Sequence, residues 1–282
     1  MCPLLLLLSL ALALSLGGCS LFRPAPGGDQ ALGRYHYQLA YGYLFENGEV
    51  ALAYQEILKS IEAYNRDPEA LLLAGILSSE RERPLDAIRY YQRSLELDSN
   101  FNRARNNLGT VYLQQGQWEQ ALPHFQRLLD DRSYRSPARA RNNLAFAFFK
   151  LGRPAEARPL LEAAIRLNHR LCPPYHNLGE VLVELEEYEE AEQAFTQGTI
   201  QCPDYPAPFF HLGQLLIRQR RLQEGIAPLQ RCLALAERSR LGRRCAQLLS
   251  SIGAPARAPE APRGRLAPGQ GISPETAPRR DR

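Results

Sequence analysis

The feature that most constrains this chain is a pattern that returns every 34 residues between positions 34 and 239. In each unit a small residue at position 20 is followed four places later by a large apolar one, and position 8 is also small in five of the six units. The clearest copy runs from Asn106 to Phe125, with Gly109, Ala121 and Phe125 at positions 8, 20 and 24. Two short helices that cross at small residues produce this spacing. Such hairpins bury their apolar faces only against neighbouring hairpins, so a stacked array is predicted.

Six units follow from this phase, with two extra residues between the third and the fourth. Their predicted bounds are 34–67, 68–101, 102–135, 138–171, 172–205 and 206–239, and a capping helix is expected at 240–252. Gly48, Gly116 and Gly152 mark turns between the paired helices. These units resemble the tetratricopeptide repeat over residues 34–239. The predicted fold is therefore all-α, a right-handed α-solenoid of six such repeats plus a cap.

The N-terminus has the pattern of an export signal. Leu4 to Leu16 is an apolar run too short to span a bilayer comfortably, and it ends in Leu16-Gly17-Gly18-Cys19. This ending resembles a bacterial lipobox, which implies a signal peptide at 1–18 and a lipoprotein acylated (palmitate included) on Cys19. A linker at 19–33 would then lead to the repeats. Ser20 after the cysteine favours the outer membrane, with the protein facing the periplasm. A plain secretory signal with an incidental cysteine is the alternative.

The C-terminus changes composition abruptly. Residues 253–282 are mostly Pro, Ala, Gly and Arg and offer few apolar side chains to bury. We expect a disordered tail there. It is either simply solvated or touches anionic lipid or peptidoglycan.

Four cysteines lie within the predicted repeats and cap. Cys172 and Cys202 stand at positions 1 and 31 of one repeat, which are at the same end of an antiparallel helix pair. A disulfide between them is the prediction for an oxidising compartment. Cys232 and Cys245 are either buried free thiols or a second bridge.

The composition excludes several function classes. The formal net charge of +4 comes from arginines dispersed among acidic residues, so a nucleic-acid surface is not indicated. The five histidines lack metal-ligand spacing, and no nucleophile elbow or phosphate-binding glycine loop occurs. We expect no cofactor, no metal and no enzymatic activity.

Function is then expected on a surface. In tetratricopeptide arrays, positions 2, 5, 9, 12 and 13 of the first helix line a concave groove. The predicted partner-binding residues are Phe45, Leu72, Ile76, Arg103, Asn106, Leu113, Arg139, Asn142, Phe146, Phe149, Val183, Phe210 and Ile217. This set suits a protein segment with apolar anchors. The Arg-x-Asn-Asn-Leu segments at 103–108 and 139–144 resemble carboxylate-clamping versions of the repeat, although asparagine there also has a structural use.

The combined layout suggests a more specific family. A lipobox, six repeats and the Tyr134–Pro137 segment between repeats 3 and 4 together resemble the pilotin lipoproteins of type IV pilus biogenesis. That resemblance implies binding to a secretin subunit, or another pilus-assembly component, and promotion of secretin assembly and stability. Two alternatives stay open: an envelope adaptor that docks cell-wall hydrolases or proteases, and a non-catalytic repeat subunit of an enzyme.

Overall fold

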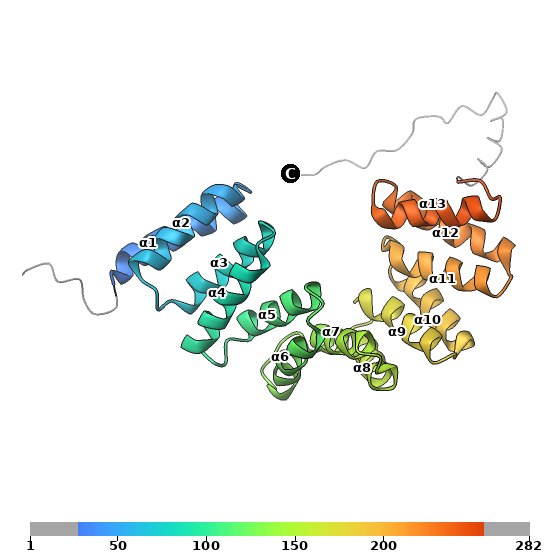
Figure 1. Cartoon of the computed structure of the whole chain (residues 1–282), viewed down its shortest axis with the longest axis horizontal. Helices are drawn as coiled ribbons and strands as arrows, with labels where there is room; N and C mark the ends of the chain where they lie inside the picture. The colour runs from blue at the N-terminus through green and yellow to red at the C-terminus, as the bar shows by residue number, and fades with distance from the viewer. Residues whose placement is uncertain (1–27, 257–282) are drawn as a thin grey trace, which may run out of the picture. The chain divides into compact units, whose positions relative to one another are not determined.

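The computed structural model describes residues 28–256, and in that range the chain is helical without strands. The signal peptide 1–18, Cys19, the linker as far as residue 27 and the tail from 257 onward lie outside the described residues. Thirteen helices make up the described part (Figure 1): α1 Gln30–Phe45, α2 Val50–Ala63, α3 Pro68–Glu80, α4 Pro84–Leu97, α5 Asn102–Gln114, α6 Trp118–Asp130, α7 Pro137–Lys150, α8 Pro154–Leu167, α9 Pro173–Glu184, α10 Tyr188–Gln201, α11 Pro206–Arg218, α12 Leu222–Ala236 and α13 Arg240–Ser251.

The chain divides into two compact units at Pro203. Unit 1 holds five helical hairpins, α1–α2 to α9–α10, and unit 2 holds the hairpin α11–α12 with α13 packed on it. Odd-numbered helices up to α11 are the first helices of the predicted repeats, and their even-numbered partners are the second helices. The all-α repeat architecture is therefore confirmed.

Proline and left-handed backbone residues set the ends of the helices. Six helices begin with proline, whose fixed φ suits the first helical position. The turn inside each hairpin then needs one residue with positive φ. Gly116 and Gly152 supply it at φ 71°, while Glu82, Glu186 and Arg220 adopt it at 56°, 62° and 65°. The same turn thus forms in repeats that lack the glycine.

Close helix crossing explains the small residues at position 8. A β-carbon added to Gly75 would lie 2.3 Å from a ring carbon of Tyr91, and one added to Gly179 would lie 2.2 Å from Phe195. Gly109 has the same relation to Phe125, at 2.8 Å. Position 24 of the second helix therefore fills the space that position 8 of the first helix leaves free. These large side chains are among the most buried in the chain.

The first repeat departs from the predicted phase. Helix α1 begins at Gln30, inside the predicted linker 19–33, because Asp29 caps it by accepting a hydrogen bond from the Leu32 amide. The turn before α2 is one residue longer than the other hairpin turns, so Ala40, not Tyr41, takes the buried position 8. The repeat starts at Gly33, whose carbonyl accepts a hydrogen bond from Ser60 Oγ at 2.7 Å; Ser94 and Pro68 repeat this contact at 2.8 Å.

Both cysteine pairs lie within bonding distance. Cys172 and Cys202 are joined in unit 1 with Cα atoms 5.8 Å apart, and Cys232 and Cys245 are joined in unit 2 at 6.3 Å. The first bridge joins the N-cap of α9 to the C-cap of α10, and the second joins positions inside α12 and α13. Among residues 28–256 there is no helix with the length and apolar character needed to cross a bilayer.

Candidate partner-binding site

The first helices of unit 1 share one inner surface. In Figure 1, α5 and α7 lie on the inner side of the bend of unit 1, and α6 and α8 lie on its outer side. Successive first helices contact one another directly from α3 to α9. The side chains that they direct inward are therefore the ones available to a bound segment.

Repeat 1 contributes an exposed aromatic stripe. Tyr37, Tyr41 and Phe45 follow one another at intervals of four residues, which places them along one side of α1. The ring centroids of Tyr41 and Phe45 are 4.4 Å apart, and their side chains are 48% and 59% exposed. Large aromatic side chains left open to solvent are typical anchors for a partner.

A polar belt follows the stripe. Arg103 Nη1 lies 2.8 Å from both carboxylate oxygens of Glu69. This ion pair connects repeat 3 to repeat 2. Burial raises the pKa of the Tyr37 hydroxyl, and the nearby charge of Glu69 raises it further. In the same repeat as Arg103, Tyr134 donates from its hydroxyl to Asn106 Oδ1 at 3.2 Å. Tyr134, in the loop that separates repeats 3 and 4, thus holds a predicted groove residue in place.

A second aromatic group lies beyond the belt, in repeat 4. Phe146 meets Trp118 edge to face with centroids 5.8 Å apart. Lys150 Nζ lies 5.2 Å from the ring of Phe146 and 5.1 Å from that of Phe149, a cation–π arrangement. Phe146 and Phe149 are half-buried, so each exposes part of its ring. An incoming segment would meet apolar surface at both ends and hydrogen-bonding groups between them.

Four predicted groove residues are not available to a partner. Leu72, Leu113, Asn142 and Phe210 are buried, which makes the prediction wrong for them. Leu72, Asn142 and Phe210 stand at position 5, which faces the first helix that follows. Asn142 Oδ1, for example, accepts a hydrogen bond from Asn177 at 2.8 Å, and Phe210 lies under Arg244 of α13. Leu113, at position 12, belongs to the core of repeats 2 to 4.

The other predicted residues vary in exposure. Phe45, Arg103 and Arg139 are exposed, whereas Ile76, Asn106, Val183 and Ile217 are half-buried. Ile217 packs in the core of unit 2.

The resemblance to a carboxylate clamp has no support in the geometry, because Glu69 already neutralises Arg103 and Asn142 is paired with Asn177. The structure adds Tyr41 to the inner surface. The sequence did not predict it because the phase of repeat 1 is shifted by one residue.

Two half-buried histidines are neutral at physiological pH. Burial lowers the pKa of His124 to about 4, with a smaller effect from the Arg105 charge, and burial alone lowers that of His176 to about 4. Residues 28–256 contain no group of His, Cys, Asp and Glu side chains placed to hold a metal ion.

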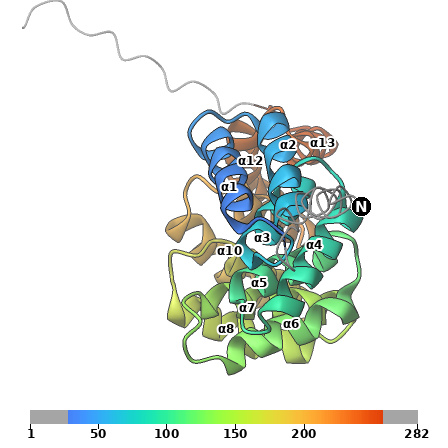
Figure 2. The same cartoon turned by 90° about the vertical axis from the view of Figure 1, so that its left-hand side faces the viewer.

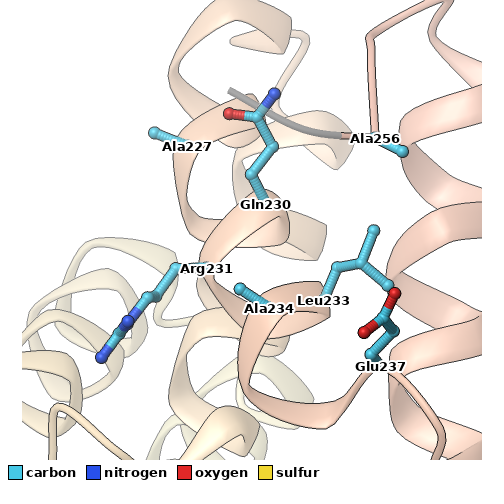
Figure 3. Close-up of a pocket in the computed structure, with 7 residues that line it drawn as sticks. All are labelled: Ala227, Gln230, Arg231, Leu233, Ala234, Glu237 and Ala256. Carbon is cyan, nitrogen blue, oxygen red and sulfur yellow. The ribbon is translucent and has the colours of Figure 1, made fainter. Parts of the chain in front are cut away.

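Unit 2 has a pocket of about 640 Å³ that sequence reasoning did not predict. Figure 3 shows Gln230, Leu233 and Glu237 around it, together with Ala256, which follows α13 in the chain. Gln230 Nε2 donates to the Pro255 carbonyl at 2.9 Å. Residues 253–256, assigned to the tail by composition, therefore turn back and pack on α12.

Hairpins that cross at small residues and carry exposed aromatic groups on the inner helices define a repeat scaffold of the kind that binds other proteins. The chain belongs to the tetratricopeptide-repeat family. The family pattern, described as "Tetratricopeptide repeat", matches residues 66–132, 100–170 and 136–199, and a second pattern of that description matches 176–239.

Comparison with individual proteins narrows the relationship. The type IV pilus assembly protein PilF of Pseudomonas aeruginosa is 28% identical over 199 residues, which cover 66% of this chain and 77% of that protein. The solved structure of Pseudomonas aeruginosa PilF superposes with a TM-score of 0.63 at 20% identity, covering 77% of this chain and 97% of that one. PilW, a type IV pilus biogenesis factor, superposes with a TM-score of 0.67 at 14% identity, covering 76% and 98%. At these identities the structural likenesses show a common fold.

Proposed function

We propose that this protein is a scaffold of type IV pilus biogenesis that acts as a pilotin: it holds a secretin subunit at the outer membrane and promotes secretin assembly. The similarity to PilF over 199 residues supports a role in pilus assembly. The role needs binding and positioning, and no chemical step.

The observation that carries the proposal is the inner surface of unit 1. Tyr41 and Phe45 offer an exposed apolar area at one end, and Phe146 with Lys150 offers a second, partly exposed one in repeat 4. The Glu69–Arg103 pair and Asn106 lie between them and can exchange hydrogen bonds with a backbone. A secretin segment with apolar side chains at its ends and polar groups in its middle fits this arrangement.

Export and lipid anchoring form the second part of the proposal. The Leu16–Cys19 sequence would place acyl chains on Cys19, and two or three chains suffice for stable attachment to a membrane. The two bonded cysteine pairs favour an oxidising compartment such as the periplasm. Mechanistically, the lipid would set the location and the inner surface would select the partner. Each bound subunit would then be concentrated at the membrane where secretins assemble.

Two variants test the two parts separately. Tyr41→Glu with Phe45→Glu should remove capture of the secretin subunit and reduce secretin multimers, because two charges would replace the apolar anchors. Leu85→Glu is the matched control: Leu85 is 72% exposed but lies on α4, a second helix. Cys19→Ala should leave the fold intact and release the protein from the membrane fraction. Normal secretin multimers in the first variant, or retained membrane fractionation in the second, would reject the respective part.

A further inference from the structure

The outward side of α1 differs from the same side of every other first helix in unit 1. With repeat 1 beginning at Gly33, position 3 is Tyr35, and its side chain is 56% exposed. The equivalent residues in α3, α5, α7 and α9 are small or compact and buried: Ala70, Ala104, Ala140 and Pro174. These four lie on helices that pack on the preceding hairpin.

Tyr35 therefore occupies a place that no other hairpin of unit 1 covers. Leu32, one turn before it, is 45% exposed. Figure 2 looks at this end of unit 1, with α1 and α2 toward the viewer. A tyrosine at position 3 would prevent a further hairpin from packing there as the others do, because that contact requires a small side chain. Stacking of a second copy onto this end is disfavoured for the same reason.

The chemistry of α1 suits a lipid headgroup layer. Between Gln30 and Phe45 the helix contains no acidic residue and no lysine, and Arg34 is its only arginine. Exposed tyrosines together with leucine and arginine are the residue types that settle at membrane interfaces. Anionic lipid would therefore meet no acidic side chain within the helix, and the Asp29 carboxylate at its N-terminus is engaged in capping the Leu32 amide.

Chain length places α1 near the proposed anchor. Ten residues, 20–29, separate Cys19 from Gln30. Even fully extended they span at most about 35 Å. We propose that the outward side of α1, centred on Leu32 and Tyr35, lies against the phospholipid surface that holds the acyl chains. This inference rests on the lipid anchor proposed above.

A second point of contact would orient the array. Acyl chains alone would leave the repeat array free to rotate relative to the membrane. Contact between α1 and the headgroups would fix the N-terminal end of unit 1. Tyr41 lies about a third of a turn around the helix from Tyr35, since successive residues are about 100° apart. The aromatic stripe of the partner-binding surface would then face away from the lipid and stay accessible to a secretin subunit.

Fluorescence quenching tests the contact. In the full mature acylated chain, Trp118→Phe removes the single tryptophan, and Tyr35→Trp introduces a reporter on the outward side of α1. The control chain carries Leu85→Trp instead, at an exposed site on α4. Both are reconstituted into phosphatidylethanolamine–phosphatidylglycerol vesicles with or without brominated acyl chains, and flotation measures their attachment.

The tryptophan at position 35 should lose about half of its emission in brominated vesicles, because interfacial side chains sit about 5–10 Å into the headgroup boundary. The one at position 85 should be unaffected. Flotation without quenching at position 35 would overturn this inference and leave the anchor standing. Failure to float would overturn the anchor and this inference together. Shielding of position 35 only after addition of secretin subunit would assign the surface to a protein and also contradict the inference.

Discussion

Phe195 lies so close to Gly179 that a β-carbon on the glycine would come within 2.2 Å of the ring. The ring is buried, and the two residues belong to the paired helices of repeat 5. The absence of a side chain at position 179 is thus what lets α9 and α10 approach. A repeat array is stabilised by contacts between neighbouring hairpins. A side chain that forces α9 and α10 apart would therefore also weaken the adjacent hairpins.

Gly179→Ala should therefore destabilise unit 1 by about 1–3 kcal/mol, the usual cost of overpacking a core. Urea unfolding followed by circular dichroism measures it. Gly42→Ala is the control, since its β-carbon would meet only Glu46 Oε2, at 3.8 Å. That variant should be neutral or more stable by up to about 1 kcal/mol, because alanine favours the helix. Equal destabilisation in both would contradict the close-crossing account.

The hairpin turns offer a stabilising change. Glu82 holds a left-handed backbone at φ 56°, where Gly116 and Gly152 stand in other repeats. Glu82→Gly removes that steric cost, offset in part by the greater freedom of glycine in the unfolded chain. A gain of about 0.5–1 kcal/mol in the free energy of unfolding is expected. Gly116→Glu should lose a similar amount, and a loss in the first variant would be inconsistent with the assigned turn.

Much of the architecture was predictable because small and large residues recur at the same positions of each repeat. Gly109, Ala121 and Phe125 fix where two helices cross, and the same spacing located five of the six hairpins to within a residue or two. Repeat 1 was misplaced because its turn carries one more residue, and nothing in composition signals which turn is longer. The contact between Ser60 and the Gly33 carbonyl, together with the burial of Ala40, reveals it.

The binding surface was less predictable than the fold. Leu72, Asn142 and Phe210 were assigned to the groove from their position in the repeat, but the curvature of successive first helices decides whether position 5 faces inward or sideways. That curvature depends on packing between repeats, which a single unit does not encode. The Gln230–Pro255 contact was likewise invisible, because residues 253–256 look like a tail by composition.

The disulfides should contribute measurably to stability. Cys172 and Cys202 close a loop with a sequence separation of 30 residues. Replacing both with serine should lower the free energy of unfolding by about 2–4 kcal/mol. A chain that also carries Cys232→Ser and Cys245→Ser should no longer respond to reductant. Unchanged denaturant midpoints, with or without reductant, would show that the bridges are absent or without effect.

Stability should also fall in mild acid. The pKa of His124 is lowered to about 4 in the fold, whereas an unfolded histidine titrates near 6.5. Between these values the unfolded chain binds the extra proton and the folded chain does not, so stability decreases as pH falls from about 6.5 to about 4. His124 contributes at most about 1.4 kcal/mol per pH unit, less because it is half-buried.

Urea midpoints at pH 7 and pH 5 measure this slope, and His124→Gln should flatten it. The remaining slope would include His176, whose pKa is lowered in the same direction. An identical pH dependence in the variant would mean that His124 is not the responsible group.

The aromatic stripe on α1 is the proposed binding site for a secretin subunit. The most direct measurement is the affinity of purified secretin subunit for the chain with Cys19→Ala, compared among the otherwise unchanged protein, Tyr41→Glu with Phe45→Glu, and Leu85→Glu. We predict that the stripe variant loses at least about tenfold in affinity, or about 1.4 kcal/mol, and that Leu85→Glu binds normally. Equal binding by all three would contradict the account.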